Sequence, residues 1–561
     1  MESQFITEQN VDKSVITRLM QNRGIISDAE IDKYLHGGLL DLYSPNSMKG
    51  IPEAGELLLH KIREGQYIRI IGDYDVDGIM ASYILHTGLK RLGAICDVRI
   101  PHRVNDGYGL NGRLVCQAYL DGINTIVTCD NGIASYNWIE ILRKFGISTV
   151  VTDHHEVSYS EKEDGSQEYI IPPADVVIDP KQPGCMYPFK GLCGAGVAWK
   201  LICYLYDKAG ISKNEQYNFL EFVCIATIAD VMELKDENRI IVKEGLQRLS
   251  NTKNLGLREL IRQNNINIFQ IEPDDIGFIL GPCLNASGRL DTAELAMDLL
   301  ETEDDETATV LAQKLKILNE QRKEMTAHWV DQAIQLVTLN LLINDKVLVI
   351  YIHDCHESII GLVAGKLKEY YNKPVFVLTN SVHGIIGSGR SIEAYSMYEE
   401  ICKCKECFIR FGGHKMAAGF LLIDNNIDKF KRMINESCKL TDEDLVKKID
   451  IDMQIPFNCI NKEFVKQLDI LKPFGKGNPK PVFVSENLKV LSPRFIGKNK
   501  NVVKMVVVDE TGYKMDAIYF GDAKEFVNDV TANVPLTLTY SPSINSYMGR
   551  ENLQITIIDY K

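Results

Sequence analysis

Short apolar runs alternate with amphipathic stretches through the first half of the chain. The runs are rich in Val, Ile and Thr, as buried strands are, and the stretches between them have helical periodicity. The predicted strands cover residues 67–71, 94–100, 125–128, 148–152 and 175–178. Strands that alternate with helices at this spacing indicate a parallel sheet covered on both faces. The pattern therefore predicts an α/β fold.

A long helix and a second alternating region follow. Residues 304–343 contain no Gly or Pro and are rich in helix-forming residues, so we expect one helix that connects two domains. Beyond it, the pattern predicts strands at 347–352 and 374–378 with a helix at 359–371 between them.

The two ends of the chain have a different character. Residues 1–45 are polar, with apolar positions at helical spacing, and predict a small helical cap. After residue 449 the apolar runs read as strands with few helices between them, which indicates a small β-barrel. These runs cover residues 481–484, 502–508, 515–520, 536–540 and 553–558.

Composition and cysteine usage suggest where the protein works. The 561 residues are 45% hydrophobic and 25% charged, as in ordinary globular proteins, and the length suggests several domains. The N-terminus does not read as a signal peptide, and no apolar stretch approaches the roughly 20 residues of a membrane span. Fourteen dilute cysteines, many inside apolar runs, favour reduced thiols. We therefore predict a cytoplasmic protein without a membrane partner.

The net charge of −14 argues weakly against nucleic-acid binding, but the charge is unevenly distributed. Between residues 471 and 515 there are nine Lys or Arg and three Asp or Glu, a net charge of +6. Such a basic segment inside an acidic chain predicts a local surface for an anionic partner.

Acidic residues and histidines follow four of the apolar runs. They are Asp73, Asp75 and Asp77 after the first strand, Asp130 after the third, Asp153, His154 and His155 after the fourth, and Asp230 after an apolar helical run. The carboxyl ends of parallel strands share one edge of a sheet, so we expect these side chains to converge there. The spacing leaves open which two of Asp73, Asp75 and Asp77 act together, and the third could orient the others or cap the next helix.

This mixture of carboxylates and imidazole predicts a divalent-metal site. His154 shifts the preference from Mg²⁺ toward Mn²⁺. There are enough ligands for two cations, which could activate water and clamp a phosphoryl oxygen. A single Asp after a strand is usually a turn residue or a helix cap, and only the repetition of the pattern favours the metal site.

Other motifs carry weaker predictions. Cys402, Cys404 and Cys407 with His414 do not have the spacing of a zinc knuckle. The stretch 191–196 resembles a dinucleotide-binding loop, but no strand precedes it, so we interpret it as the start of a helix. No motif supports Ser/His/Asp catalysis.

Three glycine-containing stretches are candidates for phosphate binding. Residues 285–289 and 387–391 each place an Arg in what we interpret as a small-residue loop, and 412–414 places His414 after two glycines. Backbone N–H groups and a guanidinium can approach a phosphate together in such loops. A solvated Arg or a helix-capping His is the alternative reading.

In this order, the motifs Asp73-Tyr74-Asp75-Val76-Asp77, Asp153-His154-His155, 285–289, 387–391 and 412–419 resemble the DHH phosphoesterase superfamily. With the segment 473–479 before a barrel, they resemble its RecJ-type single-strand-specific exonucleases. The resemblance implies a DHH parallel-sheet domain, a DHH-associated domain joined to it by the long helix, and an OB-fold barrel. The boundaries we predict are 1–45 for the cap, 46–303 for the DHH domain, 304–343 for the connecting helix, 344–448 for the DHH-associated domain and 449–561 for the OB-fold.

The resemblance also implies residue roles. The superfamily's paired aspartates match Asp75 and Asp77 best, and Asp73 is the least certain of the metal ligands. The implied metal ligands are Asp73, Asp75, Asp77, Asp130, His154 and Asp230; the implied catalytic residues are His155, Asp153 and Arg289; and the implied substrate-binding residues are Arg289, Ser388, Arg390, His414, Phe474 and Lys476.

The function implied is a 5′ to 3′ exonuclease that uses two ions of Mn²⁺ or Mg²⁺, releases mononucleotides from single-stranded DNA, and serves DNA repair and recombination. A helicase, a single-strand-binding protein and a monomeric state are further expectations. The alternative is a DHH phosphodiesterase for short oligoribonucleotides or cyclic dinucleotides, which would have little use for a basic barrel. A non-catalytic nucleic-acid scaffold is disfavoured because every type of metal ligand is present.

Overall fold

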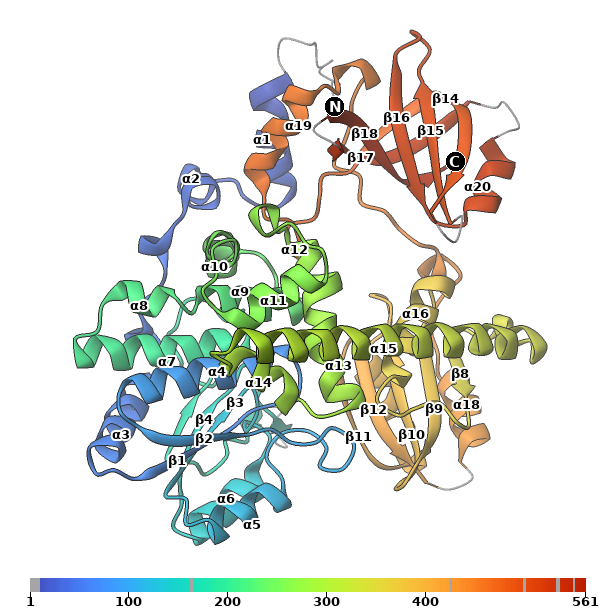
Figure 1. The fold of residues 1–561 in the computed structure, drawn as a ribbon. Coiled ribbons are helices and arrows are strands. Elements are labelled where there is room, and N and C mark those ends of the chain that lie inside the picture. Colours follow the sequence, from blue (N-terminus) through green and yellow to red (C-terminus); the bar gives the residue numbers. More distant parts are fainter. Residues whose placement is uncertain (1–10, 162–165, 424–425, 498–500, 531–534, 548–549) are drawn as a thin grey trace. The chain divides into compact units, whose positions relative to one another are not determined.

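The computed structural model describes residues 11–161, 166–423, 426–497, 501–530, 535–547 and 550–561 (Figure 1). Its contacts divide the chain into two units. The barrel unit contains Met1–Leu42, Val231–Glu244 and Ile449–Lys561, and the two-sheet unit contains Tyr43–Asp230 and Gly245–Lys448. Among the described residues, no helix combines the length and the apolar character that crossing a bilayer requires.

The first sheet of the two-sheet unit has five strands, all parallel, in the order β2-β1-β3-β4-β7. The strands are β1 (Tyr67–Ile71), β2 (Ile95–Arg99), β3 (Thr125–Cys129), β4 (Ser148–Thr152) and β7 (Val176–Ile178). The five predicted strands are confirmed. Their carboxyl ends lie along one edge, as the metal-site prediction requires.

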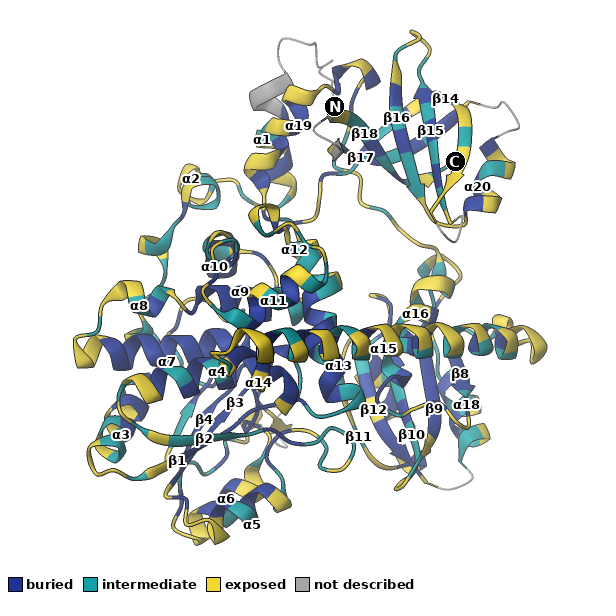
Figure 2. Cartoon of the chain, in the orientation of Figure 1, coloured by how far each residue is buried: buried dark blue, intermediate teal, exposed yellow. Residues whose placement is uncertain are grey.

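Helices cover both faces of this sheet (Figure 1). The cluster of Leu114, Ile126, Ile139 and Val151 joins α5 (Gly112–Leu120) and α6 (Tyr136–Lys144) to one face. On the other face lie α3 (Ile51–Arg63), α4 (Val76–Arg91) and α7 (Gly194–Ala209). Helix α7 is buried at every position from Gly194 to Tyr206, so it forms the centre of this layer (Figure 2).

Further helices lead to the long helix that the composition predicts. They are α8 (Lys213–Tyr217), α9 (Leu220–Ala229), α11 (Leu255–Gln263), α12 (Pro273–Asp275), the π-helix η4 (Ile276–Leu280), α13 (Gly281–Leu290) and α14 (Glu294–Glu301). Helix α15 (Asp305–Leu339) then runs for 35 residues, confirming the prediction. It contacts α11, α13 and α14 near its start and α16 (Ile360–Tyr371) further along.

The second sheet has the order β11-β12-β10-β9-β8. Its strands are β8 (Leu348–Tyr351), β9 (Val375–Ser381), β10 (Gly384–Arg390), β11 (Phe408–His414) and β12 (Ala417–Leu422). The sheet is mixed, because β8 is parallel to β9 and the other pairs are antiparallel. Helices α17 (Met397–Cys402) and α18 (Ile427–Glu436) complete this half, where Phe376, Phe408, Phe420 and Phe430 pack ring against ring.

Two of the predicted loops are regular structure. Residues 285–289 lie in α13, and 387–390 lie in β10. Their small residues are there for close packing: a Cβ on Gly288 would lie 2.6 Å from the carbonyl oxygen of Tyr74, and a Cβ on Gly387 would lie 2.2 Å from the ring of Phe420. The stretch 191–196 leads into α7, as predicted. The hairpin of β5 (Tyr159–Glu161) and β6 (Gln167–Tyr169) was not predicted.

The barrel unit closes its sheet through the pairing of β14 (Phe483–Ile496) with β17 (Leu536–Tyr547). The order is β13-β14-β15-β16-β18-β17, with β13 (Met453–Gln454), β15 (Val502–Val508), β16 (Lys514–Phe520) and β18 (Arg550–Tyr560). The predicted barrel is confirmed. Helices α19 (Lys462–Leu468) and α20 (Ala523–Val530) accompany it. Of the basic segment, Lys498 and Lys500 lie outside the described residues.

The N-terminal helices α1 (Val11–Asn22) and α2 (Asp28–His36) belong to the barrel unit. Val15 and Leu19 share a hydrophobic core with Phe464 and other C-terminal residues. Arg239, in α10 (Asp236–Leu249), donates hydrogen bonds to the carbonyl oxygens of Tyr34, Leu471 and Lys472. Three distant segments therefore fold as one body, and the domain limits we drew from the sequence stay predictions.

Candidate metal centre and arginine cavity

Side chains from the ends of β1, β3 and β4 and from the end of α9 meet around His154. Its Nε2 lies 3.1 Å from Oδ1 of Asp130, 3.6 Å from Oδ2 of Asp77 and 3.8 Å from Oδ2 of Asp230. His154, Asp77 and Asp130 are buried, and Asp230 is partly exposed. Four residues that are far apart in sequence thus share one point of the sheet edge.

The same edge holds three groups with the geometry of metal ligands. Atoms that could serve as ligands lie within 4.8 Å of one another in Asp73, Asp75 and Asp130; in Asp77, His154 and Asp230; and in Asp130, His154 and His155. Asp130 belongs both to the group with Asp73 and Asp75 and to the group with His154 and His155, so its carboxylate lies between these two groups. Asp73, which the sequence left least certain, lies with Asp75 and Asp130.

The local backbone explains how these carboxylates are held. Asp75 is the N-cap of α4, where its Oδ1 accepts a hydrogen bond from the Gly78 amide at 3.1 Å. Asp77 accepts hydrogen bonds from the amides of Gly194 and Ala195, at 2.6 and 2.7 Å, at the start of α7. Asp130 has a left-handed backbone with φ of 61°, a conformation that Asp tolerates better than most residues.

The cluster holds more negative charge than its protein partners can offset. Oδ1 of Asp73 and Oδ1 of Asp130 are buried and accept no hydrogen bond from the described residues. Burial and then the charges of neighbouring carboxylates raise the pKa of both groups well above the usual value, and burial and Asp75 raise the pKa of Asp77 to about 6. Buried carboxylates of this kind are stable when they are paired or bind a cation.

The histidine in the cluster is in the form that binds metals. Burial and then the charge of His155 lower the pKa of His154 to about 3, so its imidazole is neutral at physiological pH. Neutral imidazole together with several carboxylate oxygens suits Mn²⁺ and, with less preference for the imidazole, Mg²⁺. The residues present therefore fit a site for two divalent ions.

Asp153 is engaged differently from the other aspartates. Its Oδ2 accepts a hydrogen bond from the Ile133 amide at 2.9 Å, and its Oδ1 accepts from the His154 amide at 2.8 Å and from Nδ1 of His155 at 2.7 Å. Burial lowers the pKa of His155, but these interactions with Asp153 outweigh it and raise the pKa to about 9. Asp153 is therefore placed to orient His155, and Nε2 is the ring nitrogen that remains for a ligand.

Next to this centre, a cavity of about 430 Å³ is lined by arginines from both halves of the two-sheet unit. Arg103 and Arg289 come from the first half, and Arg390 and Arg410 come from the second. Ser388 also lines it. Burial and then the charge of Arg103 lower the pKa of Arg289 to about 9 and also lower that of Arg390. Because these cations lie close enough to lower one another's pKa, the cavity favours the binding of an anion.

Three of the six predicted substrate-binding residues line this cavity: Arg289, Ser388 and Arg390. Arg289 donates a hydrogen bond to the Ser358 carbonyl oxygen at 2.7 Å, which links α13 to the segment before α16. Burial and then the charge of His155 lower the pKa of His414, which lies on β11. Phe474 packs against the core of the barrel unit and Lys476 is exposed there. Their part in substrate binding stays a prediction.

Sequence reasoning missed several residues near the site. Tyr74, Arg103 and Arg410 line the cavity, and Tyr108 bonds to the Asp130 carbonyl oxygen. None of these residues is an acidic residue or histidine directly after a predicted strand, which was the signal used to find the site. Asp179 did have that signal, because it follows β7 as Asp130 follows β3; its carboxylate is buried, and Oδ2 has no hydrogen-bond partner among the described residues.

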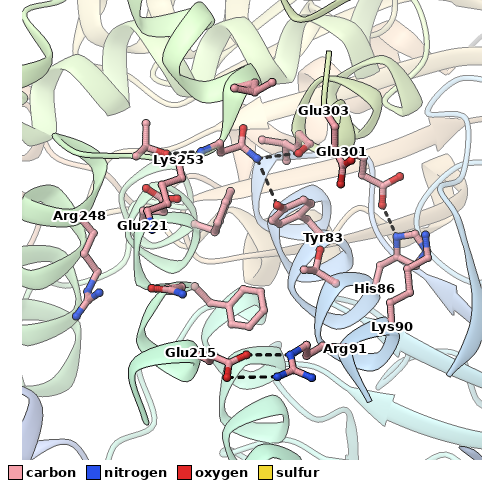
Figure 3. A pocket seen from close by; sticks show the side chains of 18 of the residues that line it. Tyr83, His86, Lys90, Arg91, Glu215, Glu221, Arg248, Lys253, Glu301 and Glu303 are labelled. Atoms are coloured by element: carbon pink, nitrogen blue, oxygen red, sulfur yellow. Dashed lines mark hydrogen bonds and ion pairs between the residues drawn. The ribbon is translucent and has the colours of Figure 1, made fainter. Parts of the chain in front are cut away.

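A second cavity of about 820 Å³ lies at the other end of α4 (Figure 3). Two ion pairs lie in it, His86 with Glu301 and Arg91 with Glu215 at 2.9 Å, whereas Nε of Arg248 is buried without a hydrogen-bond partner among the described residues. Among the described residues, Cys402, Cys404, Cys407 and His414 do not form a group with metal-ligand geometry. The acidic centre is thus the cluster with metal-ligand geometry, and in it buried oxygens of Asp73 and Asp130 accept no hydrogen bond from the described residues.

Comparisons with known proteins identify the family. Residues 67–227 match the DHH family N-terminal domain, 344–440 match the DHHA1 domain, and 451–559 match the RecJ OB domain. The chain is 34% identical to the single-stranded-DNA-specific exonuclease RecJ of Bacillus subtilis, over 99% of this chain and 69% of that protein. It is 32% identical to the protein of the same name from Haemophilus influenzae, over 97% of this chain and 96% of that one.

The chain belongs to the RecJ family. A crystal structure of Thermus thermophilus RecJ in complex with Mn²⁺ covers 97% of this chain and is 75% covered by it, with a TM-score of 0.81 and 26% identity. A structure of exonuclease RecJ bound to manganese covers 69% of this chain and is 94% covered, with a TM-score of 0.59 and 30% identity. The predicted fold class, with DHH, DHH-associated and OB-fold parts, is confirmed.

Proposed function

We propose that this protein is a metal-dependent exonuclease that hydrolyses phosphodiester bonds from an end of single-stranded DNA. The observation that carries the proposal is the cluster of carboxylates around His154, in which one buried oxygen each of Asp73 and Asp130 accepts no hydrogen bond from the described residues, beside an arginine-lined cavity. Relatives named as single-stranded-DNA-specific exonuclease RecJ support the same activity, and so does the crystal structure of Thermus thermophilus RecJ with Mn²⁺.

We assign the ligands to two ions of Mn²⁺ or Mg²⁺. Asp73, Asp75 and Asp130 would hold one ion, and Asp77, His154 and Asp230 would hold the other. Asp130 lies close to both sets. When bound, the ions would supply activation of a water molecule and would offset charge on the phosphoryl oxygens.

The chain's own residues have separate tasks in this scheme. Asp153 holds the Nδ1 hydrogen of His155, so the Nε2 side of the imidazole faces the phosphate that is cleaved. Arg289 and Arg390 offset the negative charge that develops on that phosphate or on its neighbour. Both guanidiniums are positioned by bonds to backbone carbonyls, of Ser358 and Gly389, so little reorganisation is needed when the substrate arrives.

The cavity also supports cleavage from an end. Arg103, Arg289, Arg390 and Arg410 would hold the phosphate of a strand terminus while the next phosphodiester bond lies at the metal centre. This arrangement releases mononucleotides. We infer 5′ to 3′ polarity and a role in DNA repair and recombination from the resemblance to RecJ-type exonucleases, and we propose the basic segment at 471–515 as a further contact for the strand.

Further parts of the proposal concern the setting. The fourteen cysteines, all within the described residues, are thiols and not disulfides, which supports a reducing, cytoplasmic location. We propose that the protein acts as a monomer beside a helicase and a single-strand-binding protein, because a single-strand-specific enzyme needs unpaired substrate. We retain 46–303, 304–343, 344–448 and 449–561 as domain limits, with 1–45 as an N-terminal helical segment.

The test uses the full-length protein with Mn²⁺ and substrates labelled at one end: single-stranded DNA, duplex DNA, RNA and a cyclic dinucleotide. We expect rapid loss of a 5′ label as mononucleotide from single-stranded DNA and little activity on the other substrates. Equal degradation of duplex would contradict the single-strand preference. Preferred hydrolysis of the cyclic dinucleotide would favour the alternative phosphodiesterase, and full activity of Asp130→Ala would remove the site assignment.

A further inference from the structure

The segment between β2 and α5 carries Tyr108, which touches both parts of the proposed site. Its hydroxyl donates a hydrogen bond to the Asp130 carbonyl oxygen at 2.7 Å and lies 3.2 Å from Nδ1 of His155. A tyrosine hydroxyl has one hydrogen, and here the Asp130 carbonyl takes it. Toward His155 the same oxygen can therefore only accept.

This arrangement requires a hydrogen on Nδ1 of His155. Nδ1 lies 2.7 Å from Oδ1 of Asp153 and 3.2 Å from the Tyr108 oxygen, and both of these atoms accept. The hydrogen on Nδ1 is therefore shared between the two acceptors, and Nε2 is directed away from them. Two fixed acceptors hold the plane of an imidazole ring more firmly than one.

The ring of Tyr108 continues toward the arginine cavity. It packs edge to face against His155, with centroids 5.8 Å apart, and against Tyr74, with centroids 6.5 Å apart. The guanidinium of Arg103 lies 4.6 Å from the centroid of Tyr74. Both Tyr74 and Arg103 line the cavity, so a continuous chain of contacts joins it to His155 and Asp130.

The segment is built to keep this position. Nδ1 of His102 accepts hydrogen bonds from the amides of Val104 and Asn105, at 3.3 and 3.2 Å, and Asp106 accepts from the His102 amide and from Arg113. Gly107 and Gly109, on either side of Tyr108, have φ of 78° and 62°. A Cβ on Gly109 would lie 2.9 Å from Cβ of Asn131, the residue after Asp130, so only glycine permits this approach.

We propose that Tyr108 is a positioning residue for the hydrolysis, which fixes His155 and the Asp130 backbone together and couples them to a terminal phosphate in the arginine cavity. This inference rests on the proposed exonuclease function. It makes the terminal phosphate an activator of the chemical step as well as a binding group, because filling the cavity acts on Arg103 and Tyr74 and then, through Tyr108, on His155.

The test is Tyr108→Phe, which removes the hydroxyl and keeps the ring. We expect kcat on single-stranded DNA with a terminal phosphate to fall about 10- to 100-fold, the scale of a lost alignment, with KM changed less than about threefold. The advantage of a phosphate over a hydroxyl terminus should shrink in kcat. Tyr119→Phe is the matched control, because Tyr119 is exposed on α5 with its ring against Phe145, and it should behave as wild type.

A double-mutant cycle with Arg103→Gln measures the coupling. The two changes should be clearly less than additive in kcat, because each interrupts the same chain of contacts. Wild-type kcat in Tyr108→Phe would overturn the proposal while the exonuclease function stands, and so would strict additivity. An equal loss with both kinds of terminus, accompanied by a lower melting temperature, would make Tyr108 merely structural. If the wild-type protein does not cleave DNA at all, the proposed function fails instead.

Discussion

The two ends of helix α4 carry ionisable side chains in opposite conditions. At the N-terminal end, Asp75 and Asp77 join Asp73 and Asp130 in a cluster in which two buried carboxylate oxygens accept no hydrogen bond from the described residues. At the C-terminal end, in the cavity of Figure 3, His86 is paired with Glu301 and Arg91 with Glu215.

This difference suggests which charged side chains serve the activity and which stabilise the fold. The helix dipole favours carboxylates at the first end and cations at the second, so both ends agree with it in sign. At the acidic end, however, the carboxylates exceed what a helix end and two amides can offset. Such a surplus lowers stability unless a cation is present, whereas the paired end contributes to stability by itself.

The largest expected effect comes from neutralising the acidic end. Asp130→Asn keeps the shape of the side chain and removes one charge, so exonuclease activity should fall by about 10³-fold or more. Without metal, the variant should be more stable than wild type by about 1 kcal/mol, because burial and repulsion no longer oppose folding. With Mn²⁺, the rise in melting temperature seen for wild type should be much reduced. Activity assays and thermal melts with and without Mn²⁺ measure these effects.

The matched control for Asp130→Asn is Asp121→Asn. The Asp121 carboxylate accepts a hydrogen bond from Arg69 at 2.8 Å, and Asp121 lies between α5 and the start of β3, whereas Asp130 follows the end of β3. It should lose some stability and keep both activity and the response to Mn²⁺. If Asp130→Asn were less stable than wild type in metal-free buffer, the argument that unpaired charge marks function would fail.

The next largest effect concerns Arg289, whose buried guanidinium is surrounded by other cations. Arg289→Gln should raise KM for single-stranded DNA by about 10- to 100-fold, the value of one charged hydrogen bond to phosphate. Stability should hardly change, because burial already disfavours the charged form and lowers the pKa to about 9. Steady-state kinetics and urea unfolding measure the two quantities.

Arg262→Gln is the comparison for Arg289→Gln, since Arg262 is exposed and pairs with Glu259 three residues before it on α11. It should leave KM unchanged. An unchanged KM in Arg289→Gln would instead exclude Arg289 from substrate binding.

At the paired end of α4 we expect an effect of pH on stability. Burial of His86 lowers its pKa, but hydrogen bonds and charges of Cys96 and Glu301 outweigh it and raise the pKa to about 9. A raised folded-state pKa means that the contribution is complete below the unfolded value of about 6.5 and is lost as the pH rises through 9. The His86–Glu301 pair should contribute about 1 to 2 kcal/mol to the free energy of unfolding, a value reduced by the partial exposure of Glu301.

The measurement is the difference in unfolding free energy between wild type and Glu301→Gln at pH 6, 7.5 and 9.5. We expect this difference to shrink with increasing pH, while kcat at pH 7.5 is the same in both proteins. A difference that grows with pH would contradict the pairing, and a large loss of kcat would place this end of α4 in the active site. His328→Gln, on the surface of α15, controls for the loss of an ionisable group.

The regions that sequence reasoning placed well follow a rule of topology. Asp130 and His154 were predicted together because parallel strands must end at a common edge, whatever packs around them, and Asp230 was added because it ends an apolar helical run in the same way. Residues 285–289 and 387–390 were wrongly predicted as loops, because small residues look the same in a loop and at a close approach of two backbones. Arg103 and Tyr108 were missed because only tertiary contacts bring them to the site, and the packing of α1 against the barrel depends on contacts across more than 400 residues.

The smallest expected effect is at Arg91 and Glu215, the exposed pair at the rim of the Figure 3 cavity. The Arg91 side chain is 55% exposed and that of Glu215 is 40% exposed, so water and salt screen the attraction between them. A double-mutant cycle of Arg91→Gln and Glu215→Gln in urea unfolding should give a coupling energy indistinguishable from zero, with activity unchanged. A clearly measurable coupling energy would mean that the geometry of the pair, and not its exposure, decides its contribution. Pairing by itself would then be a poor guide to which charges stabilise this fold, and the contrast between the two ends of α4 would depend on burial.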